Sequence, residues 1–120
     1  MPSVGVHLQQ VDYKESVADA MVAAGFYDWA VVALFYAALN LMQAYLLEVD
    51  TVAETHAKRQ RAILGRPELA GVVESYDLLK IQSENARYNC EHFDQNTFGE
   101  IRRGPYATVV EQLRAFRGTA

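Results

Sequence analysis

Residues 29–39 read WAVVALFYAAL, eleven positions with no charged side chain. A helix that is apolar around most of its circumference has no polar face to expose to solvent, so this stretch predicts a helix buried on nearly all sides. Asn40, Gln43 and Glu48 interrupt the apolar region that follows, and the unbroken run is shorter than the roughly 20 residues a membrane span needs. We therefore interpret the segment as the core of a soluble domain and expect no membrane partner.

The sequence before this stretch also has a helical pattern. Tyr13, Val17, Ala20, Met21 and Ala24 recur at three- and four-residue steps, which predicts an amphipathic helix that ends near Ala24. Gly25 follows, and glycine readily adopts the left-handed conformation that closes a helix. Asp28 is then expected to cap the central helix, which should continue to about Glu48.

The second half predicts further helices separated by breaks. Asp50 and Thr51 offer a turn and a cap for a third helix through Leu64, and Gly65-Arg66-Pro67 interrupts the chain. A fourth helix is expected over residues 68–90, with Cys90 and Phe93 on its inward stripe. Residues 94–105 resemble an irregular connection, and a last helix is expected over residues 106–116. The prediction is an all-α antiparallel bundle of four to five helices that forms one domain over residues 1–120.

Composition narrows the class of protein. The chain has 120 residues, a formal net charge of −4 and one cysteine, so neither a general DNA-coating protein nor a disulfide framework is expected. No secretory signal is visible at the N-terminus, which favours a cytoplasmic location. The histidines are far apart in sequence and the acids are scattered, so we expect no metal site and no cofactor.

Positive charge is nevertheless concentrated locally. Lys58, Arg59 and Arg61 lie in a segment without acids, and four more arginines lie near the C-terminus. These residues either form a local surface that attracts phosphate groups on a protein of net negative charge, or they lie on ordinary solvated helix faces. His56, beside them, is interpreted as a surface or capping residue.

The central helix carries more apolar surface than one bundle face covers. It lies either at the centre of the bundle or at a subunit interface, and we expect a symmetric homodimer. Tyr36, Asn40, Gln43 and Leu47 fall on one line along this helix. Asn40 and Gln43 either satisfy each other or water, as buried polar groups usually do, or line a cleft.

Three segments together resemble the HEPN superfamily of small helical domains. They are GFYDWAVVALFYAALNLMQAYL (residues 25–46), HAKR (residues 56–59) and YDLLKIQSENARYNCEHF (residues 76–93). The resemblance implies a four- or five-helix bundle that dimerises. Many such domains are metal-independent endoribonucleases in toxins, RNA-processing factors or defence systems, whereas others are non-catalytic binding or regulatory modules.

The nuclease motif of this superfamily is an arginine followed four to six residues later by a histidine, and Arg87 and His92 match it. Histidine titrates near neutrality and can move the proton of the RNA 2′-hydroxyl, while arginine can hold phosphate oxygens. The expected catalytic pair is therefore Arg87 and His92, with RNA oriented by Asn89 and the segment containing Lys58, Arg59 and Arg61. On a continuous helix the pair would lie roughly 140° apart, so the helix must end or distort between them.

Two other hypotheses remain from the residues alone. Arg87 is spaced to form intrahelical ion pairs with Glu84 and Glu91, which would make it structural. The chain would then be a non-catalytic RNA- or nucleotide-binding module, or one that binds a protein partner such as an antitoxin. Asp94 stands two residues after His92, where toxins controlled by a nucleotidyltransferase antitoxin carry a modified tyrosine.

Overall fold

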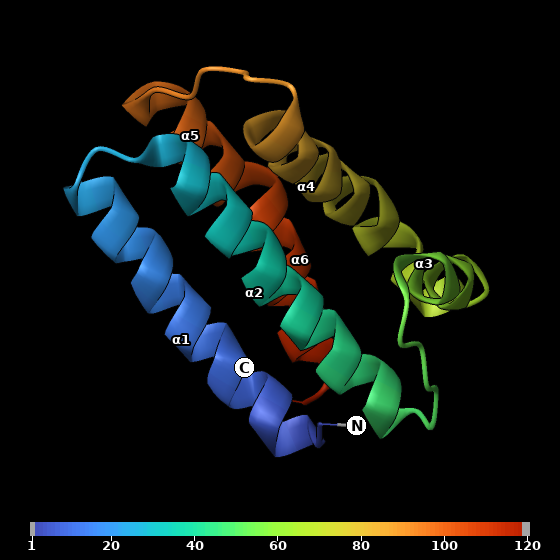
Figure 1. Ribbon diagram of the computed structural model, residues 1–120. Coiled ribbons are helices and arrows are strands. Elements are labelled where there is room, and N and C mark those ends of the chain that lie inside the picture. The colour runs from blue at the N-terminus through green and yellow to red at the C-terminus, as the bar shows by residue number, and fades with distance from the viewer. Residues whose placement is uncertain (1, 119–120) are drawn as a thin grey trace.

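A computed structural model describes residues 2–118, and the part it describes is helical, with no β-strand. The helices are α1 (Val4–Ala23), α2 (Tyr27–Glu48), α3 (His56–Leu64), α4 (Ala70–Tyr88), α5 (Gln95–Ile101) and α6 (Ala107–Phe116). A 3₁₀ turn, η1 (Pro67–Leu69), precedes α4, and a π-helical turn, η2 (Arg102–Tyr106), joins α5 to α6. Because α5, η2 and α6 follow one another without a break, the chain forms five helical rods (Figure 1). The predicted all-α bundle is confirmed.

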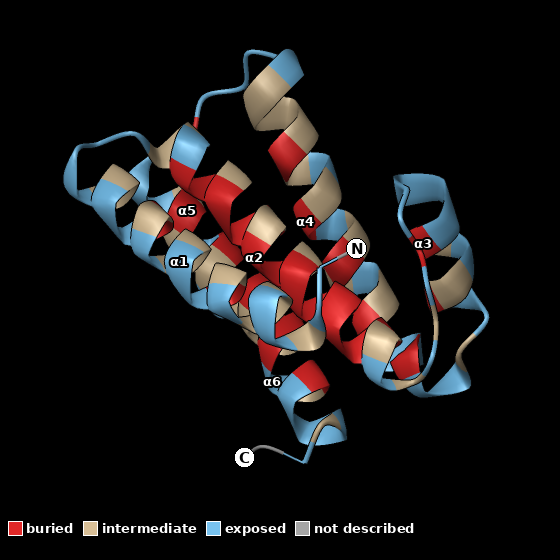
Figure 2. Cartoon of the chain, turned by 60° about the horizontal axis from the view of Figure 1, so that its bottom comes forward, coloured by how far each residue is buried: buried red, intermediate tan, exposed pale blue. Residues whose placement is uncertain are grey.

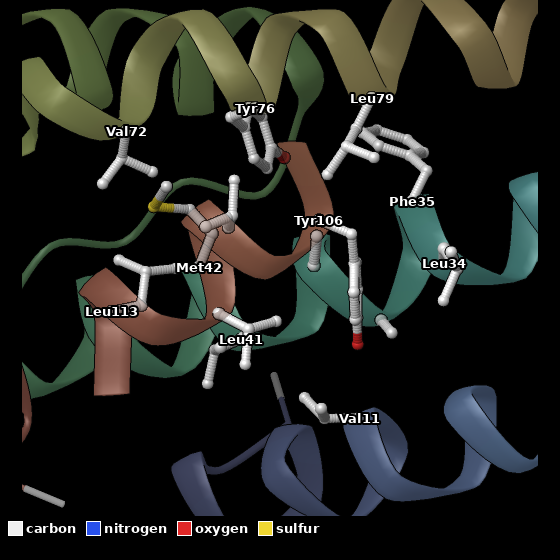
Figure 3. Packing of buried hydrophobic residues seen from close by; sticks show 14 of the residues in the cluster. Val11, Leu34, Phe35, Leu41, Met42, Val72, Tyr76, Leu79, Tyr106 and Leu113 are labelled. Carbon is white, nitrogen blue, oxygen red and sulfur yellow. The ribbon is translucent and has the colours of Figure 1, made fainter. Parts of the chain in front are cut away.

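Helix α2 occupies the centre of the bundle. It packs against α1, α4, α5 and α6, and most of its residues are buried, as the red band along it in Figure 2 shows. Leu34, Phe35 and Met42 have no exposed surface, and Figure 3 shows them among side chains from α4 and from the rod that ends in α6. This central position accounts for the apolar excess of α2 within a single chain. The helix is long and apolar enough to span a bilayer by composition, yet 78% of its most apolar window is buried inside the fold.

The helix ends follow local capping rules. Ser3 accepts the Val6 N–H at 3.2 Å and starts α1. Gly25, with φ at +82°, ends it, while the Phe26 N–H bonds the Met21 carbonyl at 2.8 Å in a Schellman arrangement. The prediction for Gly25 is therefore confirmed. Pro67 stands in the first turn of η1, where its missing N–H costs nothing, so the predicted break is confirmed as well.

The two predicted caps after Gly25 were wrong. Asp28 lies inside the first turn of α2 and accepts the Trp29 N–H at 2.9 Å, whereas Phe26 occupies the cap position. Thr55, not Thr51, caps α3 by accepting the Lys58 N–H at 3.1 Å.

The face of α1 that enters the core also differs from the predicted stripe. Val11 and Ala18 are buried, whereas Tyr13 is 63% exposed. Val17 and Met21 of the predicted stripe are partly buried against the core, so the inward face of α1 overlaps that stripe but excludes Tyr13.

Two corrections concern the second half of the chain. Helix α4 ends at Tyr88, and Cys90 is exposed with φ at +53°, so it is not part of an inward stripe. Residues 94–105 are largely helical rather than irregular. Asp94 caps α5 by accepting the Thr97 N–H at 2.8 Å, and the wider η2 turn accommodates Pro105, which lacks an N–H.

Candidate functional site

Arg87 lies in the last turn of α4 and is held by an aromatic residue of α2. Its Nη1 donates to the Tyr36 hydroxyl at 2.9 Å, and its Nε donates to the Ser83 carbonyl at 3.3 Å. The guanidinium lies 5.5 Å from the Tyr36 ring centre and 4.9 Å from that of Tyr88. Such cation–π contacts orient the planar group without neutralising its charge.

The predicted ion pairs of Arg87 with Glu84 and Glu91 do not form. Within residues 2–118, Arg87 has no ion pair, whereas Arg66, Arg102 and Arg117 are paired with Glu68, Asp19 and Glu48. The half-buried guanidinium therefore has no carboxylate partner, and it can attract an anion from outside the chain.

His92 lies beyond the end of α4, in the connection to α5, and is exposed. The helix ends between the two predicted catalytic residues, so the 140° separation expected on a continuous helix does not apply. Over residues 2–118, no hydrogen bond or ion pair joins Arg87 to His92. The His92 imidazole instead influences Asp94, where it helps to lower the carboxyl pKa after the larger effects of the Thr97 hydrogen bonds.

A hollow of about 350 Å³ lies between α2, α3 and α4 and includes Arg87. Its wall is formed by residues of mixed charge and two aromatic rings: Phe35, His56, Lys80, Glu84, Arg87 and Tyr88. The structure thus brings Arg87 together with Lys80 and with His56, which the sequence had been interpreted to place at the surface or at a helix cap. Lys80, Glu84 and Arg87 are spaced by four and three residues, so they share one face of α4. Nothing in the sequence indicates that α3 lies opposite this face.

His56 begins α3 and is oriented by Arg59. The Nδ1 atom of its imidazole lies 3.1 Å from Nη2 of Arg59, and its ring stacks on Phe35 with the ring centres 6.4 Å apart. Burial lowers the pKa of His56 most, the charges of Arg59, Lys80 and Arg87 lower it further, and Glu84 raises it slightly. Because arginine only donates, the contact makes Nδ1 the acceptor and places the imidazole proton on Nε2.

Arg59 is 7% exposed, so it does not belong to a solvent-facing basic strip. Its Nη1 donates to the Ala53 carbonyl at 3.3 Å, while its Nε has no hydrogen-bond partner in the described part of the chain. The hydroxyl of Tyr76 is likewise buried without a partner, and burial raises its pKa to about 12 against the opposing influence of Arg59. Lys58 and Arg61, by contrast, are exposed on α3. The predicted RNA-binding segment therefore divides into one buried and two exposed cations.

The remaining predicted site residues lie elsewhere. Asn89 is exposed at the end of α4, where its Nδ2 donates to Asn85 Oδ1 at 2.8 Å. Asn40 is buried, accepts from Lys14 Nζ at 2.6 Å, and has its Nδ2 2.9 Å from His7 Nδ1. Asn40 is therefore satisfied between α1 and α2.

Gln43 donates to the Ala53 carbonyl at 2.7 Å. It also lines a separate hollow of about 200 Å³ with His7, Leu47 and Glu54. Gln43 thus combines the two roles considered from the sequence, a satisfied polar group and part of a cleft wall. Among residues 2–118, no group of three or more histidine, cysteine or acidic side chains could hold a metal ion.

Comparison of the sequence with known protein families and with curated proteins found no match.

Proposed function

We propose that this protein is a HEPN-like, metal-independent endoribonuclease that acts as a homodimer. The observation that carries the proposal is Arg87, a half-buried guanidinium without a carboxylate partner beside a hollow that also contains Lys80 and His56. A guanidinium without a carboxylate partner can donate charge-assisted hydrogen bonds to phosphate oxygens. The end of α4 at Tyr88 supports the motif, because it frees His92 from the helical position opposite Arg87.

In the proposed reaction, Arg87 binds the non-bridging oxygens of the scissile phosphate. One His92 removes the proton of the 2′-hydroxyl, and the 2′-oxygen attacks phosphorus. The bond from phosphorus to the 5′-oxygen breaks, and a second His92, from the other subunit, protonates that oxygen. The products are a 2′,3′-cyclic phosphate and a 5′-hydroxyl. The first His92 ends protonated and the second deprotonated, and proton exchange with water restores both.

An exposed aromatic patch supports the homodimer. Phe26, Trp29 and Tyr13 are each more than half exposed. Tyr13 and Trp29 line an apolar hollow of about 300 Å³ whose wall also includes Tyr36, the residue that holds Arg87. A second copy seated on this patch would lie next to the Arg87 site, as the shared active site requires. We expect Trp29→Glu to convert a dimer into a monomer and to reduce cleavage, as measured by light scattering and by an RNA assay.

The test is cleavage of a mixed-sequence single-stranded RNA in the presence of EDTA. General acid–base groups contribute about 10²- to 10⁴-fold, so His92→Ala should lower the rate by at least about a hundredfold. Arg87→Ala should lower it comparably, while Glu91→Gln, an exposed neighbour of His92, should retain activity. The mass and circular dichroism of each variant establish that it is folded and assembled. Cleavage that persists in His92→Ala would refute the proposal.

A second function is favoured by one observation, the exposure of His92 without a contact to Arg87. In that case the same site binds RNA or a nucleotide without cleaving it, as a component of a defence or toxin–antitoxin system with a protein partner such as an antitoxin. Wild-type protein that binds RNA through Arg87 but yields no cyclic-phosphate product would favour this second function.

A further inference from the structure

The hollow between α2, α3 and α4 contains more positive charge than its surroundings neutralise. Arg87 and Lys80 line it, and the buried Arg59 contacts Nδ1 of His56, which also lines it. Neither guanidinium is paired with a carboxylate within residues 2–118, although three other arginines of this chain are. A buried cation is normally compensated by an ion pair. The missing compensation points to an anionic ligand.

We propose that this hollow binds one ribonucleotide through its phosphate group, with His56 as a neutral hydrogen-bond donor to the phosphate. The inference rests on the proposed function in placing an RNA phosphate at Arg87, and it extends that function by naming the residues that recognise a single nucleotide unit. The volume of about 350 Å³ lies at the lower end of the range for small-molecule sites, which suits one nucleotide rather than a folded RNA segment.

The role of His56 follows from its contact with Arg59. The Arg59 guanidinium donates a hydrogen bond to Nδ1 of His56, so the imidazole carries its proton on Nε2. Protonation of Nδ1 would break that hydrogen bond. A neutral imidazole donates a hydrogen bond to a phosphate oxygen without competing for a proton. His56 is therefore a binding residue, distinct in role from the proton-transferring His92.

The remaining lining residues favour a nucleoside phosphate over a bare phosphate ion. Tyr88 is 71% exposed and lines the hollow, so its ring offers a surface on which a base can stack. Glu84 adds a carboxylate that repels phosphate but accepts hydrogen bonds from ribose hydroxyls. A site for phosphate alone would gain nothing from either group.

The experiment measures binding of the four ribonucleoside 5′-monophosphates, inorganic phosphate and uridine to the wild-type protein by calorimetry and NMR titration. We expect at least one monophosphate to bind more tightly than phosphate, and uridine to bind weakest. A charge-assisted hydrogen bond to phosphate corresponds to about tenfold in affinity, so Lys80→Ala and His56→Ala should each weaken nucleotide binding by about that factor. Arg103→Ala, which removes a positive charge exposed on η2, is the matched control and should change affinity by less than about twofold.

Glu84→Leu gives the sharpest result because it removes both the charge that repels phosphate and the acceptor for ribose hydroxyls. Inorganic phosphate should bind more tightly to this variant, and the ratio of nucleotide affinity to phosphate affinity should fall. Equal losses in Lys80→Ala and Arg103→Ala would show non-specific attraction and overturn the inference, as would a wild-type protein that binds no monophosphate.

The outcome separates this inference from the nuclease proposal. Nucleotide binding by a wild-type protein that does not cleave RNA would refute the nuclease alone. RNA cleavage that is unchanged in His56→Ala and Lys80→Ala would refute the nucleotide site alone.

Discussion

The hydrogen bond from Arg87 to the Tyr36 hydroxyl is open to a quantitative test by a double-mutant cycle. Tyr36→Phe removes the acceptor and keeps the ring, and Arg87→Ala removes the donor. Hydrogen bonds to charged groups contribute about 1.5–3 kcal/mol when buried, and this pair is only half-buried, so we expect a coupling of about 1 kcal/mol. Tyr36→Phe alone should cost about that amount, and the double variant should cost about 1 kcal/mol less than the sum of the two single changes.

The measurement is urea unfolding of the four proteins, followed by circular dichroism at 222 nm. Tyr88→Phe supplies a control cycle, because its hydroxyl lies 3.4 Å from Arg87 Nη1 on an exposed side chain and should couple by no more than a few tenths of a kcal/mol. Additivity of Tyr36→Phe and Arg87→Ala to within about 0.3 kcal/mol would refute the conclusion that Tyr36 positions the guanidinium. The same result would weaken the proposed site, which depends on a fixed Arg87.

Three further predictions concern the stability of the fold. Partial desolvation and nearby positive charges lower the pKa of His7 and of His56 below their ordinary value of 6.5, so the unfolded chain binds more protons than the folded chain as the pH falls through that value. The melting temperature should therefore decrease from pH 7.5 to 5.5, and His7→Asn/His56→Asn should flatten the slope, whereas a melting temperature that increases on acidification would contradict the lowered pKa values. Leu41→Ala, at a position 1% exposed, should cost about 2–5 kcal/mol in urea unfolding, and Leu64→Ala, at 64% exposed, less than about 1 kcal/mol; similar losses would mean that α2 is not central. Cys90→Gly should raise the unfolding free energy by up to about 1 kcal/mol, because glycine accepts φ near +53° without the steric cost of a Cβ, and Cys90→Ala should bring no such gain.

The parts of the fold that were predictable from the sequence are those governed by local rules. The apolar run of residues 29–39 required burial wherever the chain placed it. Gly25 ended α1 and Pro67 began η1 through backbone properties that depend little on context. Residues 94–105 followed a different rule. Gly99, Gly104 and Pro105 weaken a helix locally, but burial of Phe98, Ile101 and Tyr106 against α2 and α4 stabilises one, and this tertiary contribution is not visible in a periodicity count.

The site divides in the same way. Arg87 and His92 could be selected because their spacing is local and matches a motif. The residues that hold and surround Arg87 could not be selected, since Tyr36 precedes it by 51 positions and His56 belongs to another helix. One signal was present: the segment of residues 56–59 carries a histidine three positions before an arginine on a short helix, which places both on one face. It did not indicate that Arg59 is buried or that His56 lines a hollow with residues of α4.

A fold selected for stability alone would have used the acids that this chain already places near Arg87. Glu84 is three residues away on α4, at a spacing that permits an ion pair, yet Arg87 turns to Tyr36 and Glu84 remains on the wall of the hollow. Arg59 is buried without a carboxylate while Arg66, Arg102 and Arg117 each have one. Three arginines elsewhere in the described part of the chain thus have carboxylate partners, whereas the half-buried Arg87 and the buried Arg59 beside one hollow have none. Departures of this kind reduce stability and are typical of functional sites, so the same feature that makes the hollow unfavourable in the free protein makes it favourable for an anionic ligand.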